Sequence, residues 1–209
     1  MTGYGLTECV DAAVRAYLAE HPEATVVALD EGLGTGFWRL DNGRLHWLSV
    51  LPEEAAAVRR MLLPDTARRH TLAREPAGRA WPAAVPAGTS GGVVVIAAGV
   101  LRRLPLPAGR ALLAVCAARF PGGALVFDAL PRRAAALVAG RGGLVPGSVR
   151  RPSAPRYRPP VPRALRPRVY EVRFAAGPAA PRGDERPRRG GSGAGDGGRN
   201  PAARRTHCR

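Results

Sequence analysis

The sequence predicts an α/β fold built around a mostly parallel β-sheet. Short apolar runs rich in β-branched residues occur at 25–29, 92–97 and 124–128, as expected for strands that are buried on both faces. Segments in which apolar residues recur with helical spacing lie between and before these runs, for example at 7–21 and 107–120. Strands that alternate with helices favour a parallel sheet covered by helices, and this chain has five or six candidate strands.

The first quarter of the chain is expected to supply two of these strands. Thr7 is the predicted N-cap of the first helix, and Pro22 ends it. The turn sequence Asp41-Asn42-Gly43 then separates the helical turns at 37–40 from the second strand. In order, the expected elements are a helix at 7–21, a strand at 25–29, two helical turns at 37–40 and a strand at 45–50.

The remaining elements continue the alternation of helices and strands. Glu53 and Glu54 lie in the first turn of a helix that begins at Pro52, where the helix dipole favours acidic side chains. The helix at 107–120 is expected to face inward with Ala111, Leu112, Val115 and Ala118. The full expectation is a helix at 52–63, strands at 70–73 and 92–97, a helix at 107–120, a strand at 124–128 and a late edge strand at 169–174.

The positive charge of the chain is concentrated near its C-terminus. The net charge is +16, every basic residue is an arginine, and +11 of the total falls in residues 151–209 while residues 1–150 carry only +5. The same 59 residues contain 10 prolines and 8 glycines, a composition typical of low-complexity chain. The sequence therefore predicts a folded domain at 1–150 and a basic, largely disordered tail at 151–209.

Several classes of protein are excluded by composition. Cys9, Cys116 and Cys208 are odd in number and far apart, which excludes a disulfide framework and a cysteine-based zinc ribbon, and no metal site is expected. No apolar run approaches the roughly 18 residues of a membrane span, and the N-terminus lacks the pattern of a signal peptide. We expect a soluble, cytoplasmic protein.

The most informative segment is the glycine loop that follows the first predicted strand. Residues 26–36 read Val-Val-Ala-Leu-Asp-Glu-Gly-Leu-Gly-Thr-Gly. A buried strand that runs directly into spaced glycines allows the backbone to turn sharply and a ligand to approach the amide groups. In a parallel sheet, ligands bind beyond the carboxyl ends of the strands, which is where this loop lies. The simpler alternative is a tight turn with no ligand.

An acid at the end of a strand followed by Gly-x-Gly-x-Gly resembles the first motif of class I S-adenosylmethionine-dependent methyltransferases. That resemblance implies a Rossmann-like class I methyltransferase sheet, here incomplete, and S-adenosylmethionine as cofactor. The residues that it assigns to the cofactor within the loop are Asp30, Gly32, Leu33, Gly34, Thr35 and Gly36.

A narrower resemblance covers roughly residues 8–135. It is carried by Ala13–Pro22, the glycine loop, Phe37–Gly43, Arg44–Glu53, Arg59–Pro64 and Arg119–Asp128. Together these segments resemble the leucine carboxyl methyltransferase-like family, and in particular its actinobacterial O-methyltransferase branch associated with polyketide tailoring. The resemblance implies methyl transfer to a carboxylate or hydroxyl oxygen of a small molecule.

The chain departs from this family at several positions near the implied cofactor. The family usually has an acid before the Leu-Pro that follows the second strand, and Glu53 is the nearest substitute here. Ala98 stands where the family has a glutamate, and Arg103 where it has a tyrosine. In the loop itself, Asp30, Gly34 and Gly36 replace a glycine, an acid and a longer polar residue. Glu53 and Ala98 complete the set of expected cofactor-binding residues.

Methyl transfer of this kind makes modest demands on side chains. A sulfonium meets an oxygen nucleophile, so desolvation and in-line positioning contribute most, and only a hydroxyl acceptor needs a base. His46 and His70 are more simply explained as surface or core histidines, and no catalytic residue is assigned. Two alternatives stay open: a catalytically inactive methyltransferase remnant, and nucleic-acid binding through the arginine-rich tail.

Overall fold

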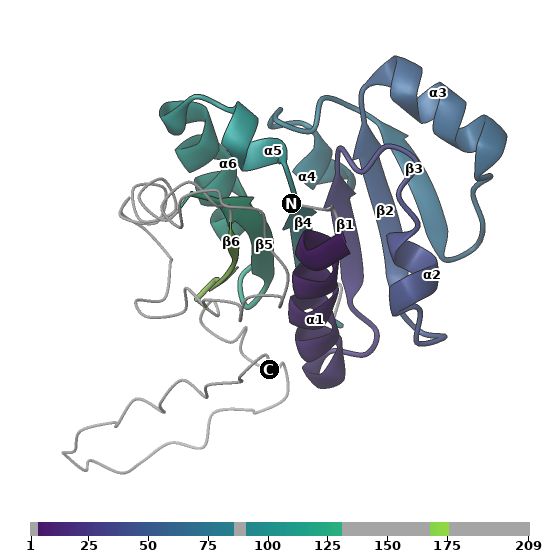
Figure 1. Cartoon of the computed structure of the whole chain (residues 1–209), viewed down its shortest axis with the longest axis horizontal. Coiled ribbons are helices and arrows are strands. Elements are labelled where there is room, and N and C mark those ends of the chain that lie inside the picture. The colour runs from purple at the N-terminus through teal and green to yellow at the C-terminus, as the bar shows by residue number, and fades with distance from the viewer. Residues whose placement is uncertain (1–3, 86–90, 131–167, 176–209) are drawn as a thin grey trace, which may run out of the picture.

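Six strands form a single sheet in the computed structural model of the chain, which describes residues 4–85, 91–130 and 168–175 (Figure 1). The strand order is β3-β2-β1-β4-β5-β6. Strands β1 to β5 are parallel, and β6 pairs with β5 in the antiparallel direction. The strands are β1 (Thr25–Leu29), β2 (His46–Leu51), β3 (Arg69–Ala73), β4 (Val93–Ala97), β5 (Ala124–Ala129) and β6 (Arg168–Arg173).

The sheet has the strand order of a doubly wound Rossmann fold, in which the chain starts at the centre and proceeds first to one edge and then to the other. The direction changes between β1 and β4, which are direct neighbours. All residues of β1 and β4 are buried, as their uninterrupted apolar sequences predict for central strands of a covered parallel sheet. The mostly parallel α/β sheet expected from the sequence is confirmed.

Helices cover both faces of the sheet (Figure 1). On one face, Val14 and Tyr17 of the first helix pack with Val26, Ala28 and side chains of the second helix. On the other face, two later helices place side chains such as Trp81 and Leu112 against Val95, Phe127 and neighbouring strand residues. The helices are α1 (Tyr4–Glu20), α2 (Gly36–Leu40), α3 (Glu53–Leu62), α4 (Trp81–Ala84), α5 (Val100–Arg103) and α6 (Leu106–Arg119).

Two helical details differ from the expectations. Helix α1 already includes Tyr4, so Thr7 lies inside the helix and is not its N-cap. Helix α6 faces inward with Gly109, Leu112, Leu113 and Cys116, whereas Ala118 is exposed and Ala111 and Val115 are only partly buried. The buried positions 109, 112, 113 and 116 follow the i, i+3, i+4, i+7 spacing of one helix face, which is rotated from the face that was expected.

The edge strand β6 lies within the range that composition assigned to the tail. Val169, Tyr170, Val172 and Phe174 are buried against β5 and the adjoining helices, so this segment belongs to the sheet. Arg173 ties β6 to α1: it forms ion pairs with Glu171 and Glu20, and its guanidinium carbon lies 4.7 Å from the centre of the Tyr17 ring. The rest of the predicted tail, including its expected disorder, lies outside the described residues.

The helices in the described part of the chain are too short or too polar to cross a membrane.

Truncation should show that the sheet needs β6. We compare a chain that ends at residue 175 with one that ends at residue 167, which differ by little more than this strand. Burial of an apolar side chain contributes about 1.5–3 kcal/mol, so the loss of four approaches the whole stability of a typical domain, about 5–15 kcal/mol. The shorter chain should also expose the edge of β5 and aggregate.

The measurement is thermal unfolding followed by circular dichroism, with size-exclusion chromatography. The chain ending at residue 175 should unfold cooperatively and elute as one species. Equal melting temperatures for the two chains would contradict the role assigned to β6.

Candidate functional site

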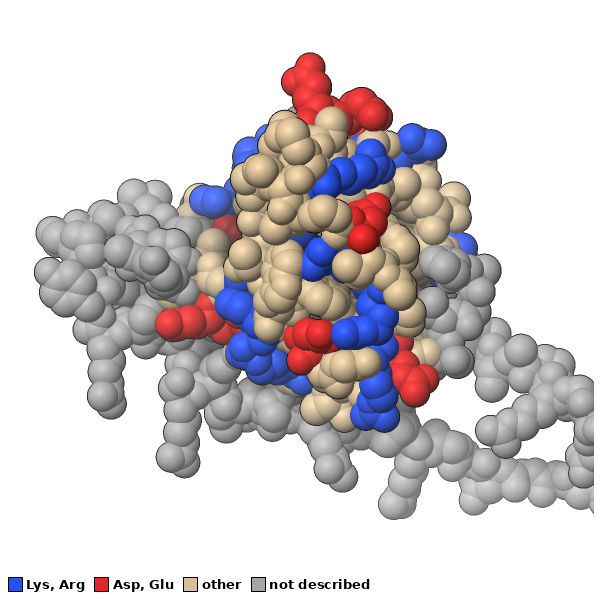
Figure 2. All heavy atoms as spheres, turned by 90° about the vertical axis from the view of Figure 1, so that its right-hand side faces the viewer, with Lys and Arg blue, Asp and Glu red and all other residues tan. Residues whose placement is uncertain are grey.

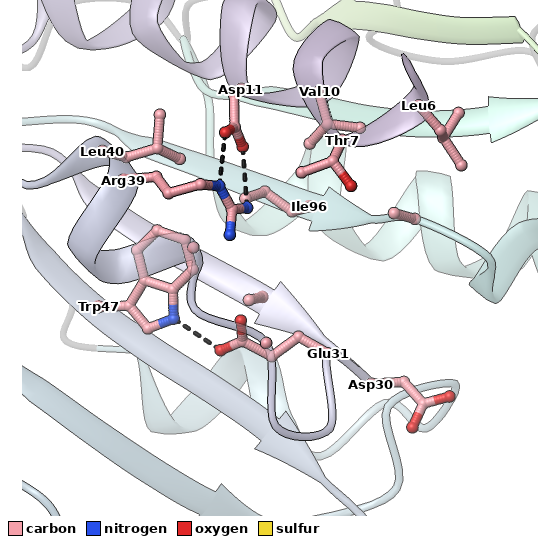
Figure 3. Close-up of a pocket in the computed structure, with 14 residues that line it drawn as sticks. Leu6, Thr7, Val10, Asp11, Asp30, Glu31, Arg39, Leu40, Trp47 and Ile96 are labelled. Carbon is pink, nitrogen blue, oxygen red and sulfur yellow. Dashed lines mark hydrogen bonds and ion pairs between the residues drawn. The ribbon is translucent and has the colours of Figure 1, made fainter. Parts of the chain in front are cut away.

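A cavity of about 260 Å³ lies at the carboxyl end of β1, between the sheet and the N-terminal half of α1. Figure 3 shows α1 residues above the cavity and residues of the glycine loop and of β2 below it. This position, beside the point where the strand order changes direction, is where open α/β sheets bind ligands. The lining residues are Leu6, Thr7, Val10, Asp11, Ala28, Asp30, Glu31, Gly34, Gly36, Arg39, Leu40, Trp47, Ile96 and Ala98.

The glycine loop begins with a sharp reversal at the end of β1. Asp30 adopts φ +54°, and among the described residues no other non-glycine residue has a positive φ. Gly32 follows with φ +56°, and the Gly34 amide donates to the Glu31 carbonyl at 2.9 Å. Left-handed backbone is costly for a residue with a Cβ, although aspartate tolerates it better than most. The loop therefore contains backbone strain at its first residue.

The carboxylate of Glu31 holds the loop against the neighbouring strand. The indole Nε1 of Trp47 donates to Glu31 Oε1 at 2.8 Å, and the Ser49 hydroxyl donates to the same oxygen. Trp47 and Ser49 both belong to β2. One acidic side chain thus joins the end of β1 to the middle of β2.

Arg59 of α3 completes this arrangement from below the loop. Its side chain is 1% exposed, and its Nη2 lies 3.0 Å from Glu31 Oε1. Its Nη1 donates to the carbonyl oxygens of Gly32 at 2.6 Å and of Gly34 at 3.1 Å. A planar guanidinium can make these contacts at once because its donors diverge in a fixed geometry. Arg59 therefore fixes the backbone of the loop as well as the carboxylate.

Burial acts on both partners of this ion pair. Burial raises the pKa of the Glu31 carboxyl, while Arg59, Ser49 and Trp47 act in the opposite direction. Burial also lowers the pKa of Arg59, and Glu31 opposes that change. Each charge is therefore costly without the other, and the pair depends on its hydrogen bonds.

Two of the glycines are required by close packing. A Cβ on Gly34 would lie 2.9 Å from the Glu31 carbonyl oxygen and 2.9 Å from Glu31 Oε2. A Cβ on Gly36 would lie 2.7 Å from Cη2 of Trp47. These positions are glycine because Glu31 and the Trp47 ring occupy the space that a side chain would need.

A second ion pair crosses the cavity from α1 to α2. Arg39 donates to Asp11 through Nε at 2.7 Å and Nη2 at 3.1 Å, and its Nη1 donates to the Thr35 hydroxyl at 2.9 Å (Figure 3). The hydrogen bonds to Asp11 raise the pKa of Arg39. Asp11 is buried, so its charge depends on this partner. The pair fixes the distance between α1 and the loop and thereby holds the cavity open.

The structure brings only some of the expected cofactor residues together. Asp30, Gly34, Gly36 and Ala98 line the cavity. The others do not: Gly32 and Leu33 lie at the outer turn of the loop, where Leu33 is 51% exposed, Thr35 binds Arg39, and Glu53 is exposed at the start of α3. Cofactor binding by all eight residues stays a prediction.

The residues that shape the site most were not singled out by the sequence. Glu31 stands within the loop, and a second acid directly after Asp30 was a usable signal, because a buried acid requires a cationic partner. Arg59 gave no such signal, because it adjoins Arg60 and lies among exposed residues of an amphipathic helix. Asp11 and Arg39 are joined only by the tertiary fold.

The histidines and cysteines of the described residues lie away from the cavity lining. His46 and His70 are exposed in β2 and β3 and do not line it. Burial raises the pKa of the Cys116 thiol to about 12, so this thiol is not nucleophilic at neutral pH. Within the same residues, no group of His, Cys, Asp and Glu side chains could hold a metal ion. Cys208 lies outside the described residues.

Comparison of the sequence with protein families and with curated proteins gives no match. Solved structures are similar in fold. One is magnesium protoporphyrin IX methyltransferase from Synechocystis with bound S-adenosylmethionine, at 15% identity, TM-score 0.53, and coverage of 82% of this chain and 81% of that one. Another is the N-methyltransferase NodS from Bradyrhizobium japonicum, at 12% identity, TM-score 0.52, and coverage of 80% and 95%.

A third similar structure is an O-methyltransferase family protein from Burkholderia thailandensis, at 16% identity and TM-score 0.52, with coverage of 84% of this chain and 57% of that chain. At these identities the likeness concerns the fold. The chain has the Rossmann-like fold of class I S-adenosylmethionine-dependent methyltransferases, and the fold class expected from the sequence is confirmed.

Loss of Arg59 should destabilise the protein strongly. Arg59→Met leaves the buried Glu31 without its cation and two loop carbonyls without a donor, so we expect unfolding free energy to fall by about 3–5 kcal/mol. Arg60→Met, at the neighbouring and far more exposed position, should cost no more than about 1 kcal/mol. Urea denaturation measures both.

A double-mutant cycle tests whether the two charges act together. Glu31→Gln combined with Arg59→Met should cost less than the sum of the single changes, by about 0.5–3 kcal/mol. Strictly additive effects would show that the 3.0 Å contact contributes nothing to stability.

Backbone strain at Asp30 should be measurable by comparing two substitutions. Asp30→Gly and Asp30→Ala both remove the carboxylate, but only alanine keeps a Cβ at φ +54°. The glycine variant should be more stable than the alanine variant by about 1 kcal/mol, because the strain exceeds the extra entropy of the unfolded glycine chain. Thermal unfolding gives the comparison, and the reverse order would show that the left-handed conformation costs nothing here.

Proposed function

We propose that the chain is an S-adenosylmethionine-dependent methyltransferase. The observation that supports this most is the cavity at the end of β1, where Gly34, Gly36 and Asp30 of the glycine loop face Ala98 beyond the end of β4. Ligands of doubly wound sheets bind at this switch point, and the fold shared with methyltransferases supports a cofactor site there. Methyl transfer to an oxygen of a small molecule follows the resemblance of residues 8–135 to the leucine carboxyl methyltransferase-like family.

The residues present fit the amino-acid end of such a cofactor. The cavity volume of about 260 Å³ is slightly below the range of about 300–1,000 Å³ typical of ligand sites, so it suits a part of the cofactor better than the whole. Ala28 and Ile96 form an apolar part of the lining, and Asp30 supplies a negative charge, while Arg39 also lines the cavity but is paired with Asp11. A ligand that carries an ammonium finds a partner of opposite sign in Asp30.

The cofactor supplies an activated methyl group, and the chain's own residues have limited tasks. The glycine loop and α1 line the cavity from opposite sides and shield part of it from water. Asp11 and Glu31 are committed to Arg39 and Arg59. The remaining acid among the described lining residues, Asp30, is paired with Arg103, so none of these acids is an uncommitted base, which suits an acceptor that is already anionic.

The two alternatives have different standing. An inactive remnant would keep the fold but not bind the cofactor, and Ala98 in place of a glutamate is the feature that favours it. Nucleic-acid binding was expected through residues 151–209, most of which lie outside the described residues. On the face of the molecule shown in Figure 2, arginine side chains of the described part are interspersed with acidic ones. That face gives no basic stripe to support the alternative.

Binding of the cofactor should be measurable by isothermal titration calorimetry with S-adenosylmethionine and S-adenosylhomocysteine. Ala98→Leu places a larger side chain in the cavity lining and should weaken binding at least tenfold, which is about 1.4 kcal/mol. The control is Ala114→Leu, the same change at an exposed position of α6 that does not line the cavity, and it should bind like the wild type. A folded wild-type protein that binds neither ligand would contradict the proposal and favour the remnant.

A further inference from the structure

An ion pair joins the two sides of the switch point. Asp30, directly after β1, pairs with Nη2 of Arg103, the last residue of α5. Strand β4 leads into α5 through Ala98 and Gly99, so the pair connects the segments that follow the two central strands. Ligands of doubly wound sheets enter between these segments. The pair therefore lies beside the candidate site, whose lining includes Asp30 but not Arg103.

The two ends of α5 are held in different ways. Asp128 of β5, whose side chain is fully buried, accepts a hydrogen bond from the Gly99 amide and lies 2.6 Å from Nε of Arg102. These contacts anchor the start of the helix and the side chain next to Arg103. Arg103 itself is 62% exposed, and its partner Asp30 is 33% exposed. Arg102 is thus tied to the buried Asp128, whereas Arg103 contacts the partly exposed Asp30.

The exposed pair is suited to exchange its partners. Exposed ion pairs contribute only about 0–1 kcal/mol, so opening this one costs little. The left-handed backbone of Asp30 turns its carboxylate away from Glu31, as Figure 3 shows, and toward the outside of the cavity. Strained residues often occur where a ligand is held, and here the strained residue lines the candidate site.

We propose that Arg103 binds the carboxylate of the cofactor's amino-acid end, a role that rests on the proposed function. The ammonium at the amino-acid end of the cofactor takes the place of Arg103 beside Asp30. The resemblance to class I methyltransferases also assigns Asp30 to the cofactor. A zwitterion carries one charge of each sign and therefore replaces both partners of the ion pair at once. In the free protein, Asp30 and Arg103 neutralise each other.

The test compares two ligands that differ in the amino-acid group. S-Adenosylhomocysteine carries the ammonium and the carboxylate, whereas 5′-methylthioadenosine has the same nucleoside thioether without them. Arg103→Met should weaken S-adenosylhomocysteine at least tenfold and change 5′-methylthioadenosine less than twofold. Asp30→Asn, which tolerates the left-handed backbone, should show the same selectivity. Calorimetry on the full chain gives all affinities.

The matched control is Arg74→Met. Arg74 is an exposed arginine that follows β3 at the same edge of the sheet, and its side chain donates a hydrogen bond to the adjacent carbonyl of Ala73. The substitution Arg74→Met removes the same charge from the chain but should leave the affinities for both ligands within twofold of the wild type. Any loss in this control equal to that in Arg103→Met would reduce the effect to long-range electrostatics and overturn the assignment.

The outcomes separate this inference from the proposed function. If the wild-type protein binds neither ligand, both proposals fail. If it binds S-adenosylhomocysteine and Arg103→Met binds it equally well, the cofactor assignment stands and the role of Arg103 is wrong. If Arg103→Met weakens both ligands to the same extent, Arg103 supports the structure of the site and does not contact the carboxylate.

Discussion

The buried ion pair between Glu31 and Arg59 is the interaction on which the candidate site depends. It connects three elements: the loop after β1, strand β2 through Trp47 and Ser49, and helix α3. Two charges at this depth are tolerated because each has several hydrogen-bonding partners in addition to the other. Without the pair, the carbonyl groups of Gly32 and Gly34 would lose their donor from α3, and the backbone that faces the cavity would lose its fixed shape.

The loop departs from the family that residues 8–135 resemble at three positions, and these departures are linked to one another by this packing. A longer side chain at position 36 would meet the Trp47 ring, and an acid at position 34 would meet the carboxylate of Glu31. The position where the family has glycine, residue 30, has a left-handed backbone here and nevertheless carries an aspartate. A single substitution back to the family residue at 34 or 36 would therefore require Glu31 or Trp47 to move. Substitutions at these contacting positions should therefore have non-additive effects on stability.

The sequence was sufficient for the strands and insufficient for the interior of the site. The apolar runs of β1, β4 and β5 specify buried strands because a surface strand would alternate with polar residues. The glycine spacing located the loop for the same local reason. The glycine spacing did not reveal whether Asp30 or Glu31 turns inward. The direction of side chains can be predicted along a strand only while its backbone is regular, and Asp30 interrupts the regular backbone with φ +54°. The partners Arg59 and Asp11 come from helices that meet the loop only in the folded chain.

The acidic side chains that line the cavity are each paired with an arginine, and this determines what kind of ligand the site can accept. Asp11 and Glu31 are largely buried, and each depends on its arginine. A ligand that broke one of these two pairs would leave a buried charge unsatisfied, which is costly. The pair between Asp30 and Arg103 is exposed on both sides and therefore opens at little cost. A zwitterionic group replaces both members of this pair at once and so binds without changing the balance of charge at the site.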